Sequence, residues 1–314
     1  MSLIRTSRPS RTSIPSRTSS PSRTSSPSRK RRVEPVFYAF LLPTVLAFTL
    51  AITVPALMGI TLSFTDSVGF GEFKFIGLTN YIAAFSDPAI LKAYGFTIGF
   101  ALVTVILVNV VSFFLALGLT EKIRAKVALR AVFVLPMVIS GIVIAYVFNF
   151  LFSNSLPDIA TAIGLKPLET SMLANPDLAW LALVLVTAWQ AVPATLLIYI
   201  AGILSIPADV YEAAALDGAT AWRKLASITI PLAAGYIVIN VIMGFKGFMN
   251  AYDVIVGLTG GGPGTSTTSV AMSIFNGFGN GDYSYQMANA TIFFLIAIVI
   301  ALLQLRATHG KATF

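Results

Sequence analysis

The chain has 314 residues, of which 56% are hydrophobic and 11% are charged, and its formal net charge is +8. A soluble domain usually carries about twice that charged fraction, so the composition excludes an ordinary soluble protein and predicts an integral membrane protein. The absence of cysteine excludes a disulfide scaffold, a zinc–thiolate site and a cysteine nucleophile. The one histidine, His309, lies close to the C-terminus, which excludes a histidine-based catalytic triad inside the membrane.

The N-terminal segment is basic and repetitive. Nine of the 21 Lys and Arg residues lie in the first 32 residues, where PSRTSI from Pro9 is followed by PSRTSS from Pro15 and Pro21. So few apolar residues cannot offset the entropy of ordering, and we predict that residues 1–33 form a disordered basic cytoplasmic tail. Such a tail could bind anionic lipid or nucleic acid. Its basic cluster adjoins a membrane span, which favours a solvated leader that helps to fix orientation, and we expect no nucleic-acid partner.

Six uncharged stretches are long enough to cross a bilayer, whose hydrocarbon core needs about 20 helical residues. A helix also satisfies its backbone polar groups internally, as lipid requires. The sequence therefore predicts an all-α fold with six transmembrane helices, the fifth extended to about Ile255 because its apolar pattern continues past Lys246. The six stretches are residues 35–65, 93–120, 131–157, 178–208, 225–245 and 283–305.

The distribution of Lys and Arg between the loops predicts the orientation. With the N-terminus in the cytoplasm, 17 of the 21 basic residues fall on the inner side and three, Lys74, Lys92 and Lys166, fall in outer loops. We therefore expect a multi-pass protein of a bacterial cell membrane with both termini in the cytoplasm.

Prolines interrupt several predicted spans, among them Pro43, Pro55, Pro136 and Pro193. Proline kinks a membrane helix and frees a carbonyl group. Each could be an ordinary packing kink, but together they suggest irregular helices around a path.

The inner loop at 207–230 differs from an ordinary connection between spans. Pro207 and Asp209 are typical of a helix start, Glu212-Ala213-Ala214-Ala215-Leu216 favours a helix, and Gly218 then interrupts it. Trp222 to Leu225 predicts a second short helix before the next span. We therefore expect a helix–Gly–helix elbow, with a plain interfacial linker as the alternative.

The spacing within this loop resembles a known motif. Glu-Ala-Ala is followed after three residues by Gly218, and after nine more by Ile228, one residue before the Ile230-Pro231 pair. This pattern resembles the EAA signature of ABC importer membrane subunits, in which Leu-Pro usually stands in place of Ile-Pro. Two further stretches, Phe75–Tyr81 (FIGLTNY) and Leu258–Pro263 (LTGGGP), are similar to loops of carbohydrate importer permeases.

The resemblance covers residues 36–307 and implies a type I ABC importer permease fold over 34–314. It also implies a second related permease subunit, two ATPase subunits, an extracytoplasmic binding protein and a sugar-like solute. The elbow would couple the permease to the ATPase. The expected coupling residues are Glu212, Ala213, Ala214, Asp217, Gly218, Trp222 and Arg223.

The resemblance places a solute path at the outer end of the third span and the middle of the fourth. Sugars present hydroxyls and apolar ring faces, which suit a Trp platform with amide partners, although contacts between helices would use the same residues. Lys246, Asn250 and Asp253 are expected on one stripe of the fifth helix, as a gate, an anion site or a snorkelling lysine. The expected path residues are Ser153, Asn154, Thr187, Trp189, Gln190, Lys246, Asn250 and Asp253.

The chain has no GxxxxGK[ST] sequence and hence no phosphate-binding loop of its own. We therefore expect it not to be an enzyme and to hold no cofactor, with ATP and Mg on the partner ATPase subunits. The alternative is a self-contained carrier or channel. That reading lacks support, because no Asp or Glu lies centrally in a predicted span and no inverted repeat is evident.

Overall fold

The computed structural model describes residues 35–121 and 126–308. The chain divides into two compact units, Met1–Ala51 and Ile52–Phe314, and each is described by itself. The predicted tail at 1–33 lies outside the described residues. In the first unit, α1 runs over Pro35–Phe48 and is followed by a π-helical turn at Thr49–Thr53.

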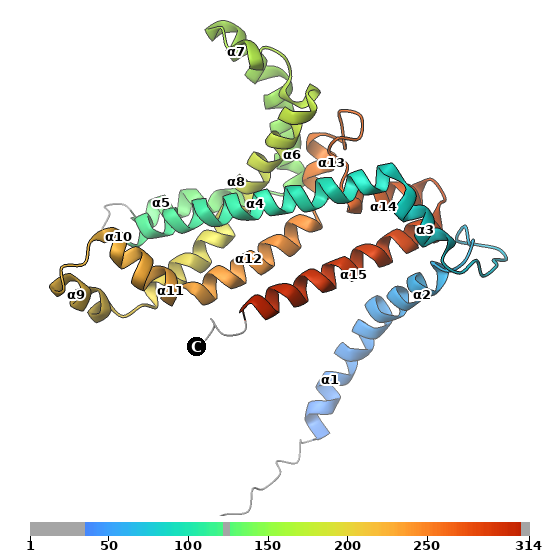
Figure 1. Cartoon of the computed structure of the whole chain (residues 1–314), viewed down its shortest axis with the longest axis horizontal. Helices are drawn as coiled ribbons and strands as arrows, with labels where there is room; N and C mark the ends of the chain where they lie inside the picture. The colour runs from blue at the N-terminus through green and yellow to red at the C-terminus, as the bar shows by residue number, and fades with distance from the viewer. Residues whose placement is uncertain (1–34, 122–125, 309–314) are drawn as a thin grey trace, which may run out of the picture. The chain divides into compact units, whose positions relative to one another are not determined.

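The second unit consists of helices and the loops between them (Figure 1). In chain order, its first seven helices are α2 (Val54–Leu62), α3 (Thr79–Ser86), α4 (Pro88–Thr120), α5 (Lys126–Val134), α6 (Gly141–Phe150), α7 (Leu156–Ile163) and α8 (Pro176–Leu204). The rest are α9 (Ala208–Leu216), α10 (Ala221–Lys224), α11 (Ile230–Leu232), α12 (Ala234–Met249), α13 (Asp253–Leu258), α14 (Val270–Gly279) and α15 (Tyr283–Thr308).

Five of the described helical stretches are long and apolar enough to cross a membrane, and a bent pair raises the number to six. They are Tyr38–Leu62, Pro88–Thr120, Gly141–Ile163, Pro176–Leu204 and Tyr283–Arg306, with Ala221–Leu232 and Ala234–Met249 as the bent pair. The predicted all-α architecture with six spans agrees with this count.

The second and fourth spans begin with the same local chemistry. Asp87 accepts a hydrogen bond from the Ala89 amide at 2.8 Å, and Asn175 accepts one from the Asp177 amide at 2.9 Å. Each cap is followed by a proline, which fits the first turn because the amide there lacks a partner in the helix. The polar cap and proline therefore fix where each long helix starts.

The predicted third span, 131–157, has the wrong boundaries. Leu135–Val138 forms a 3₁₀ turn and the chain is extended at Ile139, so the span begins only at Gly141. Pro136 explains the break because it lacks an amide hydrogen to continue the helix. Pro157 does not stop the span, because it lies in the first turn of α7, and the helix continues to Ile163 before Gly164 ends it with φ of 73°.

The predicted fifth span is also corrected. It bends by 66° between its two parts at Ala233, and its second part, α12, ends at Met249 instead of near Ile255. The Asn250 amide group donates to the Lys246 carbonyl at 2.9 Å, which satisfies a carbonyl of the last turn. Asp253 then starts a separate short helix, where an acidic residue favours the first turn.

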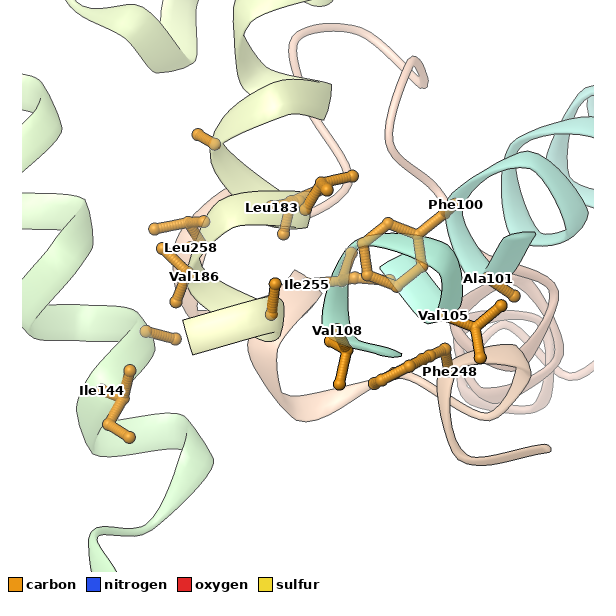
Figure 2. Close-up of a cluster of buried hydrophobic side chains, with 14 of the residues drawn as sticks. Phe100, Ala101, Val105, Val108, Ile144, Leu183, Val186, Phe248, Ile255 and Leu258 are labelled. Atoms are coloured by element: carbon orange, nitrogen blue, oxygen red, sulfur yellow. The ribbon is translucent and has the colours of Figure 1, made fainter. Parts of the chain in front are cut away.

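The buried core is centred on α4, α8 and α12, with α6 and α13 packed beside them (Figure 2). The central side chains are Phe100, Val105 and Val108 from α4, Leu183 and Val186 from α8, Phe248 from α12, Ile144 from α6 and Ile255 and Leu258 from α13. This core holds the fourth and fifth spans together, and the connection between them is the elbow.

Candidate functional site: the elbow between the fourth and fifth spans

The elbow has the predicted helix–glycine–helix form. Helix α9 ends at Leu216, and Gly218 follows with φ of 73°, a conformation that glycine adopts without a steric penalty. The amides of Gly218 and Ala219 donate to the carbonyls of Ala215 and Ala214, at 3.1 and 2.9 Å, and so close the end of the helix. The chain can therefore reverse within four residues.

The second arm of the elbow starts at a side-chain cap. Thr220 accepts a hydrogen bond from the Arg223 amide at 3.4 Å, and α10 then continues through a π-helical turn, Leu225–Thr229, into α11. At the start of α9 the capping residue is Pro207, and no side-chain hydrogen bond caps that end. Gly218 and Thr220 therefore shape the turn between the two arms of the elbow.

The elbow is a surface feature. Glu212, Ala213, Asp217, Gly218 and Arg223 are all exposed, and Ala214 is half-buried. Figure 1 shows α9 and α10 extending from one end of the second unit, beyond the ends of α4 and α12. The predicted coupling residues are thus available to another protein.

Two apolar side chains stand out on this surface. Leu216 is 91% exposed and Trp222 is 74% exposed, one on each side of Gly218. Trp is among the residue types that most often dominate the binding energy of a protein interface. Sequence reasoning singled out Trp222 and missed Leu216, whose signal is an apolar residue at the end of a short helix directly before the Asp-Gly turn.

A hollow of about 220 Å³ lies on the elbow. It contains Asp217 and Arg223, which contribute opposite charges, together with small side chains from both arms. Its lining consists of Ala214, Asp217, Ala219, Arg223, Ser227 and Ile228. The elbow therefore offers a recess that a partner's side chain can enter.

Three predicted path residues, Thr187, Trp189 and Gln190, lie in α8. Trp189 is 44% exposed, and its ring lies 5.4 Å from the Phe148 ring, which lies 5.6 Å from the Phe152 ring. The Gln190 amide donates to the Ile139 carbonyl at a long 3.5 Å. The structure thus joins α6 and α8 through an aromatic row that is partly open at Trp189.

The remaining polar residues of this region are less exposed or are already bonded. Thr187 is buried, and its hydroxyl has no hydrogen-bond partner among the described residues. Ser153 accepts a hydrogen bond from Ser171 at 3.4 Å, and Asn154 donates to the Phe150 carbonyl of its own helix at 3.2 Å. Both lie in the π-helical turn Leu151–Ser155.

The predicted stripe of Lys246, Asn250 and Asp253 on one helix is wrong. Lys246 belongs to α12, Asn250 follows the end of that helix, and Asp253 begins α13. All three are exposed, and within the described part of the chain no ion pair joins Lys246 to Asp253. Helical spacing does not place them on one face, because α12 ends at Met249, before Asn250 and Asp253.

The comparisons with known proteins agree with the predicted fold and family. Residues 109–307 match the family described as "Binding-protein-dependent transport system inner membrane component". The chain belongs to this family. It is a multi-pass membrane component of a transport system, and the predicted family membership is confirmed.

Named relatives of this permease cover most of its length. It is 36% identical over 254 residues, or 80% of this chain and 88% of the relative, to the "Multiple sugar-binding transport system permease protein MsmF" of Streptococcus mutans. It is 32% identical over 88% of this chain and 94% of the relative to the "Probable starch degradation products transport system permease protein AmyD" of Thermoanaerobacterium thermosulfurigenes. A chain of a bacterial ABC transporter involved in the import of alginate has the same fold, with a TM-score of 0.77 at 22% identity over 88% of this chain and 96% of that one.

The two loop motifs of the permease are built into its structure. In the first, Asn80 donates to the carbonyls of Ser63 and Thr65, at 2.9 and 2.8 Å, and the Tyr81 hydroxyl lies 2.6 Å from Ser63 Oγ. In the second, Thr259 and Thr267 share a hydrogen bond of 2.8 Å across the glycine-rich turn. These motifs therefore hold loop geometry at the end opposite the elbow (Figure 1).

Within residues 35–121 and 126–308, no group of three or more His, Asp or Glu side chains is placed to hold a metal ion. The candidate site consists of the exposed elbow and the partly open aromatic row at Trp189.

Proposed function

We propose that this chain is one of two related permease subunits of an ATP-driven sugar importer. Its elbow docks onto a separate ATPase subunit, and the second permease subunit docks onto another. An extracytoplasmic binding protein delivers the solute. The observation that carries the proposal is the exposed EAA elbow, which presents Leu216 and Trp222 to a partner instead of packing them inside. The names of the relatives support sugar as the solute class.

The orientation follows from the same assembly. Both termini and the elbow lie in the cytoplasm, which agrees with the 17 basic residues on that side and with a partner that uses cytoplasmic ATP. ATP and Mg are held by the ATPase subunits. This chain supplies the surface that receives their movement, and closure of the ATPase pair would shift the permease between inward-open and outward-open states.

The solute path runs beside Trp189 and Gln190 of α8. A sugar ring places apolar C–H groups against an aromatic face, and its hydroxyls need hydrogen-bond partners. The ring of Trp189 meets the Phe148 ring edge to face, and Gln190 makes a long 3.5 Å hydrogen bond that a solute can replace. Thr187, Ser153, Asn154, Lys246, Asn250 and Asp253 are proposed as secondary contacts.

The test is purification of the tagged chain from its native membrane in mild detergent. An ATPase subunit and a second EAA-bearing permease should co-purify with the wild-type chain. Gly218→Pro should remove the ATPase, because proline fixes φ near −65° where the elbow needs 73°, and Glu212→Lys should do so by reversing a charge. Both variants should keep the second permease. A wild-type chain that purifies without an ATPase contradicts the proposal.

A further inference from the structure

The fourth and fifth spans are fastened to each other at three levels, and the first level lies at the base of the elbow. The Tyr211 hydroxyl of α9 lies 2.9 Å from Thr229 Oγ1, at the end of the π-helical turn that leads into α11. Thr229 is buried. This hydrogen bond joins the two arms of the elbow.

The second level lies just beyond the bend at Ala233. A Cβ atom built on Gly202 of α8 would lie 2.6 Å from the Tyr236 ring of α12. Glycine is therefore what allows the two helices to approach this closely. Ala233 itself is fully buried, so the bend is enclosed by packing.

The third level lies deeper in the span. The Asn240 amide of α12 donates to the Thr195 carbonyl of α8 at 3.3 Å. The nearby Tyr199 hydroxyl donates to Asn109 of α4, and both Tyr199 and Asn240 are buried. This level therefore also ties α4 to the pair.

The three levels run antiparallel and in order away from the elbow. Tyr211 pairs with Thr229, Gly202 with Tyr236, and Thr195 with Asn240. The fifth span could bend at Ala233, where its two parts meet at 66°, and the elbow could flex at Gly218. The first level closes the elbow, and the second and third hold the chain on the far side of the bend.

We infer that these residues act as a coupling ladder: Tyr211, Thr229, Gly202, Tyr236, Thr195 and Asn240 are positioning residues that make α8, the elbow and α12 move as one body. The inference rests on the proposed function, in which an ATPase moves the elbow. A push on α9 then rotates α12 and, through Tyr199 and Asn109, α4. Without the ladder the same push is absorbed by bending at Gly218 and Ala233.

The experiment measures a distance within the moving part. The chain has no cysteine, so Asp209→Cys on α9 and Met243→Cys on α12 provide two spin-label sites on exposed residues. The complete complex, with its other subunits free of reactive cysteine, is measured by pulsed electron spin resonance. Spectra are taken without nucleotide and after trapping with ATP and vanadate.

Matched variants remove one hydroxyl each. Tyr211→Phe and Thr229→Val break the first level from opposite sides, and Thr229→Ser keeps the hydroxyl. Thr291→Val is the control, because the Thr291 hydroxyl donates to the Met287 carbonyl of its own helix, at 2.8 Å, and has no other hydrogen bond among the described residues. The wild type, Thr229→Ser and Thr291→Val should give one narrow distance that is unchanged by trapping. Tyr211→Phe and Thr229→Val should broaden the distribution at least twofold and shift it on trapping.

Two results would overturn the ladder. One is a wild-type distance that changes on trapping, and the other is a wild-type distribution in both Tyr211→Phe and Thr229→Val. Failure of the proposed function looks different, because the wild-type complex would then contain no ATPase. In that case the widths of the distance distributions measured without nucleotide, for the same variants, still decide whether the ladder holds the elbow rigid.

Discussion

The ring of Tyr236 on α12 fills the space that a side chain at Gly202 on α8 would occupy, with Cγ of the ring 2.6 Å from the position of a Cβ atom. This contact sets how closely the fourth and fifth spans approach one another beside the bend. It also explains why the residue at this position in the last turn of α8 has no side chain.

Gly202→Ala should therefore destabilise the protein. The added methyl group must displace the Tyr236 ring and the helix that carries it, and overpacking of this kind costs about 1–3 kcal/mol. Thermal unfolding in detergent measures the change. The matched control is Gly95→Ala on α4, where nothing lies within 4 Å of the new Cβ atom; this variant should be as stable as the wild type or more so. Equal melting temperatures for the two variants would refute the packing argument.

Leu216→Ser should weaken binding of the ATPase at least tenfold, which corresponds to about 1.4 kcal/mol. Leu216 is 91% exposed beside the elbow turn, so its loss removes apolar contact area without disturbing the fold. Titration of purified ATPase subunit onto the permease pair measures the affinity. Ile163→Ser is the control, since Ile163 is 64% exposed on α7, away from the elbow; an equal loss of affinity in this variant would contradict a specific role for Leu216.

Trp189→Ala should reduce stimulation of ATP hydrolysis by solute-loaded binding protein more than tenfold, while Trp189→Phe keeps most of it. The reason is that an aromatic face is retained in the second variant and lost in the first. Tyr146→Ala serves as the control, because Tyr146 is 61% exposed on α6 and no ring contact joins it to the Phe148–Trp189 row in the described part of the chain. A wild-type response in Trp189→Ala would remove Trp189 from the path.

Asn149→Leu should destabilise the protein by about 1–3 kcal/mol. The Asn149 amide donates to the Leu258 carbonyl at 2.6 Å and so satisfies the end of α13, and leaving a partly buried carbonyl without a partner costs about that much. Asn154→Leu should have little effect on the melting temperature, since Asn154 is exposed and its amide donates to the Phe150 carbonyl of its own helix. The prediction fails if the two variants melt together.

Sequence alone predicted the membrane class, the six spans and the elbow, because each follows from local chemistry. Uncharged runs of 20 or more residues predict membrane-spanning helices. Gly218 after a run of helix formers indicates a turn. The break before Gly141 and the end of α12 at Met249 were missed. In both places uncharged residues continue past the break, so hydropathy carries no signal, and Pro136 and Asn250 decide the outcome.

The contacts between spans could not be predicted from the sequence. Tyr211 and Thr229 lie 18 positions apart and Gly202 and Tyr236 lie 34 apart, and no local pattern pairs them. Leu216 was overlooked for a different reason. An apolar residue in a short helix is usually buried, and only the reversal of the chain at Gly218 leaves it exposed.

The central claim is that this chain cannot move solute without a partner that hydrolyses ATP. The most direct test places the chain in liposomes, first alone and then with the second permease, the ATPase subunits and the binding protein, and measures accumulation of a panel of radiolabelled sugars. The account predicts no accumulation by the chain alone and ATP-dependent accumulation by the full complex, which Gly218→Pro abolishes. Accumulation of any sugar against its gradient by the chain alone would contradict the account.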